Sequence, residues 1–194
     1  MMMDANRTAL LVIDVQKAFE VRDARGDKRS NPSAEANIAR LLSLFRDNGL
    51  HVVHVHHHSL RETSLFRAEL PTAEPQAFVA PRGGERVYTK NQNSAFVGTS
   101  LHTDLRDAAL TTLVICGATA NHCVETTARM AGNFGFDVRY VGDAVWAYDA
   151  IGVDGSVIPA ATMHAATLAN IAEEFGSVIE TADVVRALSE ASSR

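Results

Sequence analysis

Three side chains with complementary chemistry stand at the ends of predicted secondary-structure elements. Asp14 ends an apolar run, Lys90 ends a short strand-like segment, and Cys123 stands at the junction between a loop and a predicted helix. The thiolate is the attacking species in nucleophilic catalysis by cysteine, whereas a free thiol is mostly protonated at neutral pH. A nearby ammonium group and a helix N-terminus favour the thiolate, and a carboxylate can carry its proton. The set is therefore suited to an activated cysteine nucleophile.

Each of these residues alone has an ordinary structural interpretation. An aspartate at a strand end is more often a cap, a lysine there is more often solvated, and a cysteine at a helix start is more often a small packing residue. Their common placement indicates a site without naming its reaction.

Alternating apolar runs and helical patterns must position these side chains. The continuous run TALLVIDV is typical of a strand buried on both faces. The expected strands cover residues 8–15, 51–56, 86–90, 112–116, 137–141 and 177–179. The expected helices cover residues 31–48, 101–109, 121–134, 158–175 and 182–189.

Strands that alternate with helices predict parallel pairing through right-handed crossovers. We therefore expect an α/β fold, a three-layer sandwich with a mainly parallel sheet of about six strands, formed by one domain over residues 1–194. Sites in such folds lie outside the C-terminal ends of the strands, which is where Asp14, Lys90 and Cys123 fall.

Composition narrows the function classes. The net charge of −5 gives no reason to expect a nucleic acid or an anionic membrane as partner. The basic residues between positions 22 and 29 are interrupted by acids, which predicts a solvated loop. With two cysteines, no secretory signal pattern and no apolar run long enough to span a bilayer, a cytoplasmic protein is expected.

Three motifs identify a resemblance over nearly the whole chain. They are LLVIDVQKAF at 10–19, YTKNQNSAFVGTSL at 88–101 and VICGATANHCVETTARMAGNFGFDV at 114–138. The chain resembles the isochorismatase-like cysteine hydrolases, which include nicotinamidases, N-carbamoylsarcosine amidohydrolase, ureidoacrylate amidohydrolase and streptothricin hydrolase. The resemblance implies that Asp14, Lys90 and Cys123 form a catalytic triad. It further implies hydrolysis of a C–N bond (amide, ureido or carbamoyl) of a small molecule through a Cys123 thioester, without a cofactor.

The resemblance also implies a cis peptide just before the nucleophile, between Ala118 and Thr119. That geometry would turn the Thr119 N–H inward beside the Cys123 N–H, which together would form an oxyanion hole. Without the resemblance an ordinary trans loop would be expected.

Several aromatic and polar residues are expected near the predicted mouth of the site. The expected pocket residues are Phe19, His58, Phe96, Asn121 and Trp146. Alternation on a strand would place His54, His56 and His58 on one face, as in a metal-binding array. The Asp-x-His pattern that nicotinamidases use for a metal is missing here. We therefore expect histidines that line a pocket, and no metal.

Other functions remain open from the sequence. An isochorismatase-type vinyl-ether hydrolase would use the acid and would not need Cys123. A thiol redox sensor would use Cys123 with Cys116, although Cys116 lies within an apolar run. A binding protein that keeps the fold is a third possibility. A homodimer or higher homo-oligomer is expected, with residues 59–86 across a neighbouring subunit.

Overall fold

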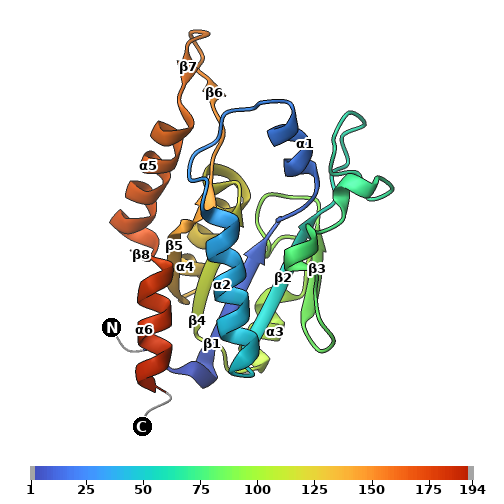
Figure 1. Cartoon of the computed structure of the whole chain (residues 1–194). Helices are drawn as coiled ribbons and strands as arrows, with labels where there is room; N and C mark the ends of the chain where they lie inside the picture. The colour runs from blue at the N-terminus through green and yellow to red at the C-terminus, as the bar shows by residue number, and fades with distance from the viewer. Residues whose placement is uncertain (1–2, 192–194) are drawn as a thin grey trace.

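A six-stranded parallel sheet forms the centre of the computed structural model, which describes residues 3–191 (Figure 1). The strand order is β3-β2-β1-β4-β5-β8, so the chain runs outward from β1 in one direction and from β4 in the other. The expected α/β three-layer fold is confirmed. The strands are β1 (Thr8–Ile13), β2 (His51–His57), β3 (Arg86–Lys90), β4 (Thr112–Ala118), β5 (Asp137–Trp146) and β8 (Ser177–Ile179).

Two helical layers bury the two faces of the sheet (Figure 1). One core joins Leu10 and Val12 of β1 to α2 and α6, and the other joins Leu11 and Ile13 to α3 and α4. None of the helices within residues 3–191 has the length and apolar character that crossing a bilayer requires. The helices are α1 (Ala18–Ala24), α2 (Ala34–Asp47), α3 (Leu101–Asp107), α4 (Glu125–Asn133), α5 (Ala160–Asn170) and α6 (Thr181–Ala191).

The structure corrects several expected boundaries. Helix α1 lies partly where the sequence predicts a loop. The sequence shows no amphipathic stripe there, because the helix buries only Ala18 and Phe19. Strand β5 runs to Trp146 past a register irregularity, and a short hairpin of β6 (Ala150–Ile151) and β7 (Val157–Ile158) follows it. The expected helices 121–134 and 158–175 each include a π-helical turn.

The two central strands approach unusually closely where they end. A Cβ on Gly117 would lie 2.1 Å from the Ile13 carbonyl oxygen, and Gly117 has φ +124°. Asp14, with φ 53°, leaves the sheet at the same level. This approach brings the end of β1 beside the segment that follows β4, where the predicted nucleophile stands.

Candidate active site

A buried ion pair joins two of the three predicted residues. Lys90 Nζ donates to Asp14 Oδ2 at 2.6 Å, and neither side chain is more than 2% exposed. Strand register sets this geometry. Strand β2 lies between β1, which Asp14 follows, and β3, in which Lys90 is paired with His57. The Asp14 N–H also donates to the Val55 carbonyl at 2.8 Å. Both charges are thus removed from water and neutralise each other.

Cys123 stands beside this pair. It belongs to the π-helical turn Ala120–Val124, and its sulfur, an Asp14 carboxylate oxygen and a His57 ring nitrogen all lie within 4.8 Å of one another. Asp14 Oδ1 is buried and has no hydrogen-bond partner among the described residues. The structure therefore brings together the three predicted residues, with one carboxylate oxygen available to a proton from the thiol.

The electrostatics keep that proton on sulfur in the free protein. Burial and the negative charge of Asp14 raise the pKa of Cys123 to about 12, and Lys90 opposes them. Burial also raises the pKa of Asp14, against the lowering effect of Lys90. Burial and the Lys90 charge lower the pKa of His57, which favours a neutral imidazole. The resting set is a thiol beside a carboxylate–ammonium pair.

The segment before Cys123 has the geometry that the resemblance implies. The peptide bond between Ala118 and Thr119 is cis, and both residues line the same cavity as Cys123. Thr119 Oγ1 and His122 Nδ1 are 2.9 Å apart, a hydrogen bond that ties the turn together. An oxyanion hole made by the Thr119 and Cys123 amides stays a prediction.

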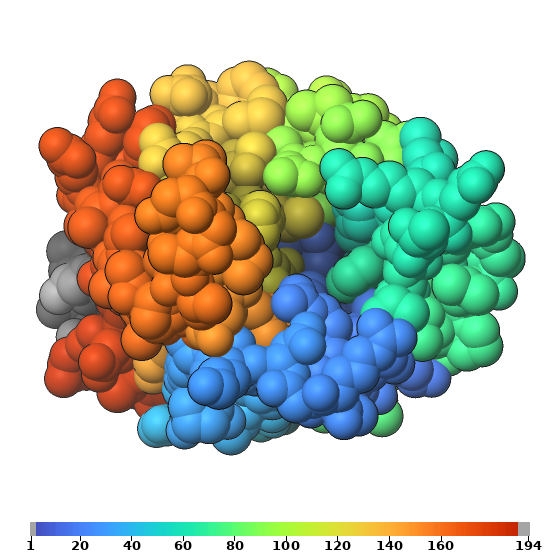
Figure 2. Space-filling view, turned by 90° about the horizontal axis from the view of Figure 1, so that it is seen from above, coloured from blue at the N-terminus to red at the C-terminus, as the bar shows by residue number. Residues whose placement is uncertain are grey.

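A cavity of about 580 Å³ opens above these groups. Its wall comes from the ends of β1 and β2, from the loop after β3, from the turn after β4 and from α1. Figure 2 looks down on this side of the molecule and shows a hollow between the blue N-terminal segment, the teal segment after β2 and the green segment after β3. Such a volume suits a small molecule.

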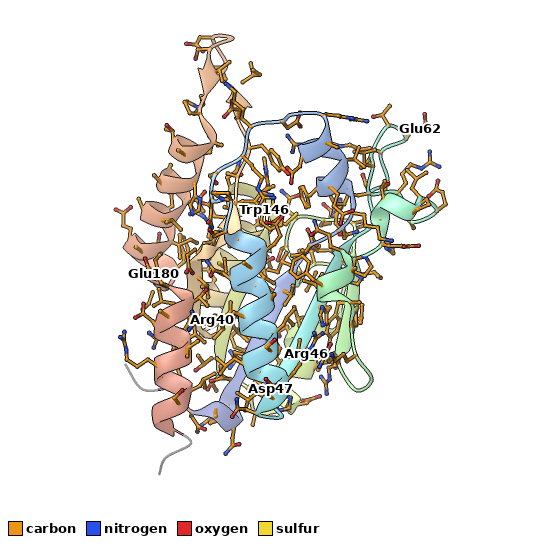
Figure 3. All side chains as sticks on the ribbon, in the orientation of Figure 1. Arg40, Arg46, Asp47, Glu62, Trp146 and Glu180 are labelled. Carbon is orange, nitrogen blue, oxygen red and sulfur yellow. The ribbon has the colours of Figure 1, made fainter. Side chains whose placement is uncertain are left out.

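The aromatic expectations hold only in part. Phe19 lines the cavity. Trp146, labelled in Figure 3, is fully buried and packs edge-on against Phe19, with ring centroids 5.4 Å apart. Phe96 is corrected: it packs against Phe134 and Phe136 in the core under α3 and α4, because the chain after β3 turns it to that face.

The expected pocket roles of Asn121 and His58 are also corrected. Asn121 is not part of the cavity wall, and its Oδ1 is buried without a partner among the described residues. His58 lies past the end of β2, and its N–H donates to the Lys90 carbonyl at 2.7 Å. His57 lines the cavity in its place, because alternation along β2 puts it on the face of Val53 and Val55, which is the side on which Cys123 packs.

The remaining strand histidines face the other side of the sheet. The rings of His54 and His56 are 6.3 Å apart, and His54 Nε2 lies 2.8 Å from Glu85 Oε2. Asp14, His57 and Cys123 could supply metal ligands, but Lys90 Nζ is 2.6 Å from Asp14 and 3.4 Å from His57 Nδ1. An ammonium group in that position repels a cation, so the donor set fits proton transfer better than metal binding.

One residue of the motif at 10–19 has a structural role that the sequence analysis missed. Gln16 is fully buried, its Nε2 donates to the His57 carbonyl at 3.0 Å, and its Oε1 accepts from the His57 N–H at 2.8 Å. These bonds fix the backbone of His57 at the cavity. Only the fold shows that a glutamine next to β1 reaches the end of β2.

Comparisons of the sequence and of the structure with known proteins both find the isochorismatase family. The isochorismatase domain family matches residues 8–183. The chain is 37% identical to the uncharacterized isochorismatase family protein YrdC of Bacillus subtilis, over 92% of this chain and 95% of that one. A crystal structure of an isochorismatase-family hydrolase from Chromobacterium violaceum superposes with a TM-score of 0.92 at 36% identity, covering 98% of this chain and 97% of that one.

Two further relatives have names that state an activity. Streptothricin hydrolase of Streptomyces noursei is 34% identical over 79% of this chain and 60% of its own length. Maleamate amidohydrolase of Pseudomonas putida is 28% identical over 94% of this chain and 87% of its own.

Proposed function

Because the chain belongs to the isochorismatase family of hydrolases, we propose that it hydrolyses a C–N bond of a small amide, ureido or carbamoyl compound through a Cys123 thioester. The observation that carries the proposal is the buried Lys90–Asp14 pair beside the Cys123 sulfur on the wall of a cavity. A buried charge pair of this kind is costly as a purely structural feature and well suited to moving a proton.

The proposed reaction runs in two steps. Asp14 Oδ1 accepts the thiol proton while sulfur attacks the carbonyl carbon, and the oxyanion is held by the Thr119 and Cys123 amides. Asp14 then gives that proton to the departing nitrogen as the C–N bond breaks, which leaves a thioester. In the second step Asp14 takes a proton from water, the hydroxide displaces sulfur, and the proton returns to Cys123.

In this scheme the main effect of Lys90 is on the Asp14 carboxylate rather than on the resting thiol. Since the pKa of Cys123 is about 12, the free protein does not store a thiolate. The positive charge of Lys90 instead opposes the effect of burial on the pKa of Asp14, and in this scheme it stabilises the sulfur anion as it forms. We propose that the nucleophile is generated only as substrate is attacked.

Two relatives support C–N hydrolysis, while another, 34% identical over 91% of this chain, is named a secreted isochorismatase effector. The first two are named for hydrolytic reactions, and one of them is named an amidohydrolase. A redox sensor is disfavoured, because Cys116 is fully buried and lies in the core on the α2 side of the sheet, whereas Cys123 packs on the α4 side. A resolving cysteine would have to be accessible.

One observation favours a second candidate, vinyl-ether hydrolysis. The raised pKa of Asp14 would suit a general acid that protonates a carbon–carbon double bond. That reaction would use the cavity and Asp14 and would not need the Cys123 sulfur.

Replacement of the two cysteines separates these functions. Ammonia release from a panel of amides, ureas and carbamoyl compounds should vanish in Cys123→Ala, and the protein should stay folded by circular dichroism. Cys116→Ala is the matched control and should keep turnover, because its sulfur lies in a core away from the cavity. Turnover of amides by Cys123→Ala would refute the thioester, and hydrolysis of vinyl ethers by that variant would establish the second candidate.

A further inference from the structure

The mouth of the cavity carries positive charge in a molecule that is negative overall. The net charge of the chain is −5, yet the charged residues on the cavity wall are Arg22, Arg61 and Asp14. Asp14 is already neutralised by Lys90 at 2.6 Å. Among the described residues the wall therefore presents Arg61 without an ion pair, Arg22 paired with Asp27, and no carboxylate besides Asp14, a balance that favours anions.

Arg22 is held in position on α1. Its Nε donates to Asp27 Oδ2 at 2.8 Å, and its Cζ lies 3.8 Å from the centre of the Tyr148 ring. Tyr148 is itself fixed by a 2.6 Å hydrogen bond from its hydroxyl to Asp23. The terminal guanidinium nitrogens of Arg22 have no hydrogen-bond partner among the described residues, so they remain available to a ligand.

Arg61 lies on the loop after β2, next to the labelled Glu62 in Figure 3. Within residues 3–191 its guanidinium makes no ion pair, and its backbone donates to Ser59 Oγ and accepts from the Ser64 N–H. Arg67 of the same loop differs, because it pairs with Glu69 and donates to the Glu62 carbonyl. An arginine that faces a cavity without a carboxylate partner is suited to recognise one in a ligand.

We propose that the substrate bears a carboxylate at the end remote from the scissile C–N bond, and that Arg61, with Arg22, binds it. This inference rests on the proposed function. It places the reacting carbonyl at Cys123 on the cavity wall and the anionic end at the mouth. Uncharged Asn91, Gln92 and Asn93 also line the cavity and offer hydrogen bonds without repelling an anion.

The charge preference can be measured without knowing the substrate. Iodoacetate and iodoacetamide alkylate the same thiol and differ in one carboxylate, so their rate ratio at Cys123 at a fixed pH cancels the thiolate fraction. We expect Arg61→Gln to lower the iodoacetate-to-iodoacetamide ratio by about two- to fivefold, and added salt to lower it in wild type. Arg61→Lys should keep most of the ratio.

Arg82→Gln is the matched control, since it removes the same charge from a different cavity near Arg46, at the opposite end of β2. Its ratio should equal that of wild type. An equal ratio in Arg61→Gln and Arg82→Gln overturns the proposal.

Hydrolysis supplies the second measurement. The probes are two matched pairs, succinamate with succinamide and maleamate with maleamide. Arg61→Gln should raise KM for the anionic member of a pair and leave KM for the neutral member unchanged. An equal change in both KM values overturns the carboxylate assignment. If wild type cleaves none of these amides, the proposed amide hydrolysis is contradicted. The ratio of the two alkylation rates still tests whether the cavity prefers an anion.

Discussion

Two neighbours act in opposite directions on the proton of Cys123. Asp14 raises the pKa of the thiol by its negative charge, and Lys90 lowers it, so that burial and Asp14 prevail in the free protein. The same carboxylate that disfavours a resting thiolate is the group placed to accept the proton. Reactivity at this residue therefore depends on the substrate being present, which limits wasteful oxidation of the sulfur.

The charge of Lys90 is open to a direct test. Lys90→Met keeps the apolar stem and removes the ammonium, so the pKa of Cys123 should rise further and hydrolysis at neutral pH should fall by about 100-fold. The measurement is the alkylation rate of Cys123 against pH. Lys17→Met, which breaks the exposed pair with Glu74, is the control and should leave the curve in place. Coincident curves for Lys90→Met and wild type would remove Lys90 from the triad.

The pH dependence of turnover follows from Asp14. Burial raises its pKa above the ordinary 3.8, so as pH falls the carboxylate takes up a proton earlier than an exposed aspartate would and can no longer accept one from the thiol. The acid limb of kcat/KM should therefore lie above pH 3.8. A vinyl-ether hydrolase that needs protonated Asp14 would instead turn over faster as pH falls through this range. Whether kcat/KM falls or rises on acidification therefore separates the two reactions.

At the scale of elements, β2 is tied to its surroundings by a charged network away from the cavity. Glu85 accepts from Arg46 Nε at 2.7 Å and from the Arg82 N–H at 2.7 Å, and lies 2.8 Å from His54. Figure 3 shows Arg46 toward the end of α2 that lies away from the loops of the cavity. Burial raises the pKa of Glu85, but its hydrogen bonds outweigh this and lower the pKa to about 2.

Glu85→Gln should lower the free energy of unfolding at neutral pH by about 1–3 kcal/mol, because it removes the negative charge that pairs with the half-buried Arg46. The depressed pKa stabilises the fold above pH 4.5, and this contribution is lost as pH falls toward about 2. Urea denaturation at neutral pH and at about pH 3 measures both effects. Between neutral pH and about pH 3 the free energy of unfolding should fall less in the variant than in wild type. An equal fall in the two proteins would assign the acid sensitivity to other groups.

Gly117 controls how closely β4 approaches β1. An alanine there would place its Cβ 2.1 Å from the Ile13 carbonyl oxygen, so Gly117→Ala should cost more than about 3 kcal/mol or prevent folding. Gly135→Ala is the matched control, since Gly135 also has a positive φ, of +78°, but meets no atom closer than 3.9 Å. Its cost should be about 1–2 kcal/mol. Similar melting temperatures for the two variants would show that β4 moves without penalty.

The sequence predicted the parts that repeat simple rules. Strands β1 and β4 are apolar runs followed by Asp14 and by the turn before Cys123, and Lys90 ends the short strand β3, so the rule about strand ends placed the three together. Helix α1 buries too few residues to show a period, and the face of β2 that carries Val53 and Val55 places His57 rather than His58 at the cavity. Gln16 and Arg61 lie on loops and Arg22 lies on α1, and the position of each at the site depends on the finished fold.

At the scale of the whole molecule, we propose that the chain forms a homo-oligomer. The β6–β7 hairpin projects from the body and exposes three large apolar side chains, Ile151, Val153 and Val157 (Figure 1). Association would remove this surface from water. Light scattering at micromolar concentration should give at least twice the monomer mass of 20.9 kDa. Val153→Lys with Ile151→Lys should lower that mass, whereas Leu60→Lys, in the loop first expected at the interface, should not. A monomeric wild type would contradict the proposal.

The order of the strands divides the molecule at its active site. A break in the backbone between residues 91 and 112 would leave β3-β2-β1 on one fragment and β4-β5-β8 on the other. Asp14 and Lys90 would belong to the first fragment and Cys123 to the second, so neither fragment alone would hold both the nucleophile and its proton acceptor. Hydrolysis would return only when the β1–β4 seam reassembled. The chain is thus a candidate split reporter, in which fusing two proteins to the halves would convert their encounter into enzymatic turnover.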